Sequence, residues 1–417
     1  MTNPEHLNTP LQRNSVSVYL IILVALSSCY GQLNAFTQVA QYTPSIGVVL
    51  LATFLLLSGK IKNFQKSSTQ SVICGAIITL SALLGAMLSQ DAQSALYALV
   101  FIFTWMAILV ILQKYTMTAI LRSFAYGGFV SVLIYLAMSG FKIQGALTIS
   151  GNEFSTGDRA TGPFTSHPNL IAHNMAIFTI LAVVLAPSEK TIGKLILYGT
   201  AIFATLILLS TASRGGLVAL VTALIIATTI THRKNLKHLL LIFSLLVVAG
   251  IYIALFQSEY IDRLILIMDL NSSSRGLNSG LSGRQQLWSM VFSQFFTINI
   301  PFFWGGGFRN AWLSNFISAV DNGYIVIIAE TGFISLIIIL ARLAFVLLRS
   351  AKRVKLTPNS MDAAIVGLVS FILIESIVAR YFLAIGNPAS FLILFLIVAG
   401  AKGYIIEKRY PLPQNTL

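Results

Sequence analysis

Three arginines stand in short segments where a guanidinium could bind an anion. Arg214 precedes two glycines, Arg284 follows a glycine, and Arg380 lies shortly before an Asn-Pro pair. A planar guanidinium grips carboxylate or phosphate through two parallel hydrogen bonds, and a helix beginning at Arg284 would add positive charge there. Each arginine also has a purely structural interpretation, as a turn residue, a solvated helix start or an interfacial anchor. Both interpretations stay open at this stage.

An acidic side chain near such arginines could accept a proton. Asp321 stands beside Asn322 at the start of a long apolar run, where it is either a helix N-cap or a general base. Glu330 follows nine residues later, on the opposite side of a helix and roughly 13 Å deeper, so the two carboxylates do not pair on one face. We expect Glu330 and Glu375 to pack or hydrogen-bond against other helices, although buried carboxylates in membranes are often functional.

Candidate metal ligands are scarce near these arginines and carboxylates. Of five histidines, only His167 and His173 lie near the arginine segments, and they are typical of a capping turn and a helix core. The sequence contains no HExxH, DxD or Walker-type glycine-rich loop. We therefore expect neither a metal nor a cofactor.

The composition determines which elements position these residues. Of 417 residues, 56% are hydrophobic and only 10% charged, with a mean hydropathy of +0.83. Soluble proteins carry about 25% charged residues, so this chain lacks a water-facing surface. The net charge of +14 is spread over small clusters between apolar runs, which excludes a nucleic-acid-binding patch.

The sequence predicts an all-α, polytopic membrane helix bundle of about 12 transmembrane helices. About 20 apolar residues cross a membrane, and the first run lacks a convincing cleavage site, so we expect it to be retained. The expected spans are 17–36, 42–59, 71–88, 95–113, 117–138, 169–186, 195–212, 215–231, 238–256, 323–348, 361–383 and 387–401.

Basic residues predict the orientation. With N- and C-termini in the cytoplasm, 17 of the 27 lysines and arginines lie on the cytoplasmic side and eight on the other. Seven of those eight are arginines, whereas topology requires only charge. The outer face therefore has the character of an anion site.

The spans divide the chain into three parts. Residues 1–256 hold nine transmembrane helices and a periplasmic loop at 139–168, residues 257–322 form a large periplasmic loop, and residues 323–417 hold three helices and a cytoplasmic tail. In the large loop, apolar residues at helical spacing after Arg284 predict a short helix on the outer surface of the bundle.

Several short motifs follow one another over residues 155–335. They are Arg159 with Gly162-Pro163-Phe164 and His167-Pro168-Asn169, Ser213-Arg214-Gly215-Gly216-Leu217, Ser282-Gly283-Arg284 with Leu287-Trp288, Gly305-Gly306-Gly307-Phe308, and Asp321-Asn322-Gly323-Tyr324 with Glu330 and Gly332. Their order and spacing resemble the O-antigen ligase and Wzy-type polysaccharide polymerase superfamily.

This resemblance implies a bacterial inner-membrane glycosyltransferase of the C type, active on the periplasmic side. Such enzymes transfer a glycan from undecaprenyl pyrophosphate to an acceptor glycan, and a flippase and a chain-length regulator are implied as partners besides membrane lipids. Arg214 and Arg284 match the family's diphosphate-binding arginines, and loop 257–322 matches its catalytic loop.

One departure bears on the reaction. O-antigen ligases carry His-Asn where this chain has Asp321-Asn322, which is similar to the exopolysaccharide polymerases. We therefore favour polymerisation of repeat units of an exopolysaccharide or O-antigen over ligation to lipid A core.

The expected mechanism divides these residues into two groups. The catalytic residues are Arg214 and Arg284, which clamp the pyrophosphate, and Asp321, which accepts the proton. The predicted substrate-binding residues are Arg159, His167, Trp288, Asn322, Tyr324 and Arg380.

A transporter or lipid flippase is the alternative of another class. Its signature would be ionisable groups in mid-span and discontinuous helices.

Overall fold

The computed structural model describes residues 17–30, 43–58, 69–141, 168–232, 284–295, 302–310, 320–357, 359–383 and 388–401. Helices joined by turns account for these residues, and no strand occurs among them. The helices are α2 (Val18–Tyr30), α3 (Thr43–Leu57), α4 (Thr69–Leu88), α5 (Ala92–Lys114), α6 (Met117–Met138), α7 (Pro168–Leu185), η5 (Ala186–Ser188), α8 (Thr191–Ser210), α9 (Arg214–His232), α12 (Arg284–Phe295), α14 (Gly323–Leu356), α15 (Ser360–Glu375) and α16 (Pro388–Ala401).

The prediction of an all-α polytopic bundle is confirmed. Within the described ranges, seven helices are long and apolar enough to cross a membrane, namely α4 to α9 and α14. Each predicted span overlaps a described helix, except 238–256, which lies outside the described residues. The predicted short helix after Arg284 is α12.

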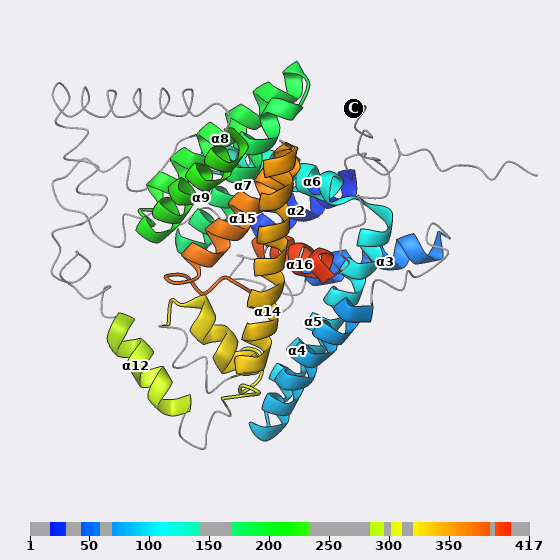
Figure 1. Ribbon diagram of the computed structural model, residues 1–417, viewed down its shortest axis with the longest axis vertical. Helices are drawn as coiled ribbons and strands as arrows, with labels where there is room; N and C mark the ends of the chain where they lie inside the picture. The colour runs from blue at the N-terminus through cyan, green and yellow to red at the C-terminus, as the bar shows by residue number, and fades with distance from the viewer. Residues whose placement is uncertain are drawn as a thin grey trace, which may run out of the picture.

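The bundle is organised around α7 and α14. Helix α7 packs against α6, α8, α9 and α15, and α14 packs against α4, α15 and α16. Figure 1 shows α14 running between the group of α7, α8, α9 and α15 and the group of α3, α4 and α5. Leucines and isoleucines on the outward faces are exposed, such as Leu57 at 84% and Ile192 at 75%. Such faces suit a bilayer, whose lipid tails are as apolar as these side chains.

Helix α14 covers the predicted span 323–348, but it is broken at Gly332, which the sequence analysis did not predict. Gly332 has φ 82° and ψ 168°, a conformation essentially restricted to glycine, and the chain changes direction there. The two parts of α14 are visible at an angle in Figure 1. Helix α15 also ends earlier than predicted, at Glu375, and residues 376–383 form turns instead.

The predicted outer ends of several helices meet at one end of the bundle, which we call the outer end. There the amide of Gly323 at the start of α14 donates to the Ser376 carbonyl after α15. A Cβ on Gly215 at the start of α9 would lie 2.4 Å from Val378. The turn after α15 therefore joins the starts of α9 and α14, and so gathers segments far apart in sequence.

Candidate active site

The glycines after Arg214 bring the start of α9 close to its neighbours. Gly215 packs against Val378 in the turn after α15, and a Cβ on Gly216 would lie 3.4 Å from Ala172 of α7. Larger residues at Gly215 would push these elements apart. Arg214, the first residue of α9, therefore lies where α9, α7 and the turn after α15 meet.

Asn322, and not Asp321, caps α14. The Asn322 side-chain oxygen accepts hydrogen bonds from the amides of Tyr324 at 3.0 Å and Ile325 at 3.1 Å, and its nitrogen donates to the Ile377 carbonyl at 3.1 Å. The capping interpretation of Asp321 is therefore wrong. Because Asn322 already accepts the hydrogen bonds of the first amides of α14, the half-buried Asp321 is not needed as the helix cap.

Tyr381 links Asp321 to Arg380. The Arg380 side chain donates a hydrogen bond to the Tyr381 hydroxyl, and the carboxylates of Asp321 and Glu375 act on that hydroxyl electrostatically. Tyr381 is buried, with 6% of its surface exposed. Asp321 and Arg380 thus share one neighbourhood beside the turn that also contacts the start of α9.

A glycine-rich segment, residues 302–310, fills the break in α14. The amide of Gly306 donates to the Ala329 carbonyl at 2.7 Å and that of Gly307 to the Glu330 carbonyl at 3.0 Å, while the Phe333 amide donates to Phe302 at 2.9 Å. We call this segment the glycine strap. It satisfies the carbonyls that the break at α14 leaves without helical partners.

The glycine strap also makes a contact with the Glu330 carboxylate that the sequence analysis missed. The Arg309 amide donates to the Glu330 carboxylate at 3.1 Å, and Arg309 adopts φ 50°, unusual for a residue other than glycine. Its guanidinium lies 5.0 Å from the centre of the Tyr97 ring. Glu330 interacts electrostatically with both Arg309 and Arg380. We expected Glu330 to pack or hydrogen-bond against another helix; it does accept a hydrogen bond, but from the non-helical glycine strap, for which the run of three glycines was the available signal.

A buried histidine contacts a buried carboxylate next to the turn after α15. His173 Nδ1 contacts the Glu375 carboxylate, and each residue is only 2% exposed. The His173 ring lies 5.6 Å from the ring of Phe371 and 5.8 Å from that of Tyr381. His173 is thus the predicted core histidine, and it fixes Glu375, the last residue of α15, against α7.

The structure describes some of the remaining predicted site residues and not others. Arg159 and His167 lie outside the described residues, and Arg284 is the first residue of α12 with its side chain outside them. Trp288 of α12 packs against the core, partly buried. Tyr324 donates its hydroxyl to the Leu373 carbonyl and meets the Phe382 ring edge-on, so it joins α14 to α15.

Helix α12 lies beside the first part of α14, away from the main bundle (Figure 1). Phe295 near its end contacts the ring of Phe302 at 6.1 Å, which stacks on Phe333 of α14 at 4.9 Å. The glycine strap thus connects α12 to α14.

Among the described residues, no three His, Cys, Asp or Glu side chains lie close enough together to hold a metal ion.

Residues 199–340 match the family model Wzy_C, described as O-antigen ligase. This part of the chain is therefore similar to the O-antigen ligase family. The matched segment begins in α8 and ends in α14, and it includes Arg214, Arg284 and Asp321. Arg380 lies beyond it, on the turn that contacts the starts of α9 and α14. No curated protein matches the chain.

The match to this segment agrees with the resemblance found in the motifs. Together with the seven apolar helices of membrane-spanning length among the described residues, it indicates an integral membrane protein similar to O-antigen ligases and polymerases. The glycine strap and the break in α14 both fall inside the matched segment.

Proposed function

We propose that the protein transfers a glycan from undecaprenyl pyrophosphate to an acceptor hydroxyl, without a metal, on the periplasmic face of the bacterial inner membrane. The product is a polymer of oligosaccharide repeat units of an exopolysaccharide or O-antigen. The observation that carries this proposal is the convergence at the outer end, where the turn after α15 contacts the starts of α9 and α14. That turn brings Arg214, Asp321 and Arg380 to one corner of the bundle.

Each residue has a defined role in the proposed reaction. The acceptor oxygen bonds to the anomeric carbon as the bond from that carbon to the pyrophosphate oxygen breaks, which inverts the anomeric configuration. Arg214 and Arg284 stabilise the negative charge that develops on the departing diphosphate, with Arg159 and Arg380 as further cations. Asp321 accepts the proton of the acceptor hydroxyl. Four cations around a diphosphate supply the electrostatic stabilisation that a metal provides in other transferases.

Polymerisation is favoured over ligation because of the residue before Asn322. That position holds Asp321, whereas the ligase pattern has a histidine there. The Asn322 side chain is already used as the N-cap of α14. We therefore attribute the difference between polymerisation and ligation to the residue before it, Asp321 in this chain. Ligation of a glycan to lipid A core is the second candidate, and it would use the same donor.

A specific observation also bears on the transporter alternative. Transporters use broken helices whose unpaired backbone groups bind ions or substrate, and α14 is broken at Gly332. Here the glycine strap hydrogen-bonds the Ala329 and Glu330 carbonyls next to the break. Because these carbonyls already accept hydrogen bonds from the protein, they are not open to bind a transported ion or substrate. We therefore favour a structural role for the break, in support of the outer site, over a role in transport.

The test uses purified protein in detergent with lipid-linked repeat units, with and without lipid A core. Polymerisation predicts a ladder of longer glycans on undecaprenyl pyrophosphate without lipid A core. Product formed only when lipid A core is added would replace polymerase with ligase. No joined product under either condition, together with donor movement in closed vesicles, would favour the transporter.

A further inference from the structure

Arg380 lies in a short non-helical segment, residues 376–383, that is held at both ends. The segment begins where Glu375 ends α15, and near its other end the Ser390 hydroxyl of α16 donates to the Tyr381 carbonyl at 3.0 Å. Arg380 is half-buried between these two points. The position of its guanidinium group therefore depends on what holds the two ends.

One side chain of α7 reaches both ends of this segment. His173 Nδ1 contacts the Glu375 carboxylate, and the centre of the His173 ring lies 5.8 Å from the centre of the Tyr381 ring. All three side chains are buried. Removing either polar partner would leave the other buried without a hydrogen bond, which costs more than the bond itself contributes. His173 thus joins the segment to α7 at two points.

Tyr381 connects His173 to the arginine. The Arg380 side chain donates a hydrogen bond to the Tyr381 hydroxyl, and the Glu375 carboxylate acts on that hydroxyl electrostatically. A shift of the Tyr381 ring would move the oxygen to which the guanidinium is bonded. The path from α7 to Arg380 therefore consists of two side-chain contacts, His173 to Tyr381 and Tyr381 to Arg380.

We propose that His173 is a positioning residue, which with Glu375 holds Tyr381, and through it Arg380, where the guanidinium meets the departing diphosphate. This inference rests on the proposed function, because that function makes Arg380 a cation of the diphosphate site. A displacement of about 1 Å in a group that acts on the reacting atoms can lower the rate by about a hundredfold. His173 itself is buried and acts only through its neighbours.

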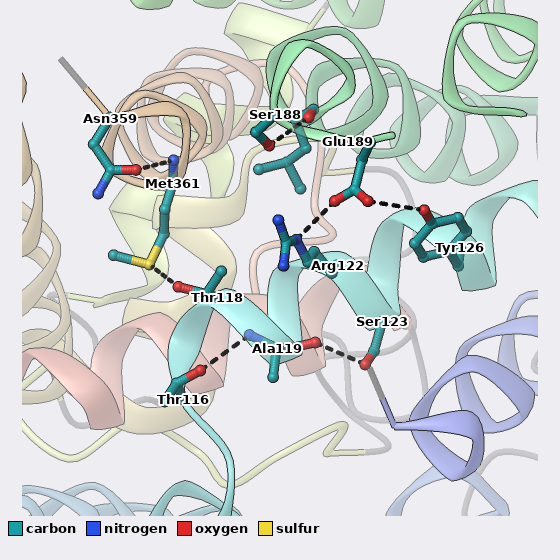
Figure 2. A network of polar contacts seen from close by, with 11 residues as sticks. Thr116, Thr118, Ala119, Arg122, Ser123, Tyr126, Ser188, Glu189, Asn359 and Met361 are labelled. Atoms are coloured by element: carbon teal, nitrogen blue, oxygen red, sulfur yellow. Dashed lines mark hydrogen bonds and ion pairs between the residues drawn. The ribbon is translucent and has the colours of Figure 1, made fainter. Parts of the chain in front are cut away.

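The other end of α7 supplies a matched control (Figure 2). Glu189, which follows η5, forms an ion pair with Arg122 of α6 at 2.7 Å and accepts a hydrogen bond from the Tyr126 hydroxyl at 3.2 Å. This contact also ties α7 to a neighbouring helix, but at the end opposite to His173. Glu189→Ala should therefore lower the melting temperature and keep turnover per folded molecule within about twofold of the wild type.

The atom that makes the contact predicts which substitution restores it. Nδ1 is bonded to Cγ, as is the amide nitrogen of asparagine, whereas the amide nitrogen of glutamine lies one bond further out, near Nε2. Among the described residues, Nε2 has no hydrogen-bond partner. In the transfer assay with lipid-linked repeat units, His173→Ala and His173→Gln should lower turnover about tenfold or more, and His173→Asn should keep most of it. Equal turnover of the Asn and Gln variants would overturn the assignment.

A double variant tests whether the effect passes through the arginine. His173→Ala combined with Arg380→Ala should turn over within about twofold of Arg380→Ala alone, because the path ends at that guanidinium. Losses that multiply would make His173 a purely structural residue, and so would a loss in Glu189→Ala as large as that in His173→Ala. If His173→Ala did not fold, Tyr381→Phe would remove only the hydroxyl that Arg380 contacts. It should lower turnover about as much, and wild-type turnover would contradict the path.

A binding measurement separates this inference from the proposed function. A wild-type protein that joins no glycans would refute the transferase, and the role of His173 would then be decided by the affinity for undecaprenyl pyrophosphate, measured by native mass spectrometry. His173→Gln should weaken that binding about tenfold or more, and His173→Asn should not. Equal affinities of the two variants would refute the positioning role.

Discussion

Replacing Gly332 by alanine should uncouple the glycine strap from α14. A Cβ at Gly332 would lie 2.0 Å from the Phe303 carbonyl oxygen and 2.4 Å from its carbon, both backbone atoms that cannot rotate away. Displacing the strap would break its three backbone hydrogen bonds to α14, at about 1 kcal/mol each. The φ of 82° adds about 1–3 kcal/mol of strain for alanine. Together these effects destabilise the protein by about 4–6 kcal/mol.

The matched control is Gly199→Ala on α8. A Cβ there meets nothing within 4 Å, and because alanine favours helix, this variant should be neutral or more stable by up to about 1 kcal/mol. Thermal unfolding of both purified variants, with the yield of monodisperse protein, measures the difference. If Gly332→Ala melted together with the Gly199→Ala control, the strap would not depend on the break, and our account of α14 would be refuted.

Three further predictions concern the chemistry. Asp321→Asn should lower turnover at saturating donor by roughly a hundredfold and leave the melting temperature unchanged. Asn322→Ala removes the N-cap of α14 and should destabilise the protein by about 1–2 kcal/mol. If Asp321→Asn instead lowered the stability and Asn322→Ala the turnover, the two residues would exchange roles. Arg214→Lys and Arg284→Lys should each lower the rate over a hundredfold, about 3 kcal/mol, because an ammonium cannot bind pyrophosphate through two parallel hydrogen bonds. If either lysine variant were normally inserted and kept most of the wild-type rate, the bidentate clamp would be excluded. EDTA should leave the wild-type rate unchanged, and a loss that Mg²⁺ reverses would contradict metal-independent transfer.

The spans could be predicted because membrane insertion depends on local composition. An apolar run such as 117–138 has one low-energy outcome in a bilayer, and the observed helix α6 has the same bounds. Helix α12 was predictable for a similar reason, since its apolar residues follow helical spacing. The arginine segments were recognisable from their glycines, which permit the close packing seen at Gly215.

The contacts between distant segments could not be read from local pattern. Asp321 and Asn322 are both good capping residues, and the partner that selects Asn322, the Ile377 carbonyl, is 55 residues away. His173 and Glu375 are separated by 202 residues, so neither suggests the other in a single sequence. A glycine within an apolar run is common in transmembrane helices, so Gly332 did not reveal the break without knowledge of the glycine strap.

The glycine strap has a consequence for the order of assembly during synthesis. Gly85 near the end of α4 fits directly against the strap, where a Cβ would lie 2.4 Å from the Gly305 carbonyl oxygen. Ser89 also donates to the Gly306 carbonyl at 3.1 Å. This face of α4 therefore leaves the ribosome more than two hundred residues before the segment that covers it. Until then Gly85 and Ser89 lack the backbone neighbours that the glycine strap gives them in the finished protein, so this part of α4 reaches its final packing only late in synthesis.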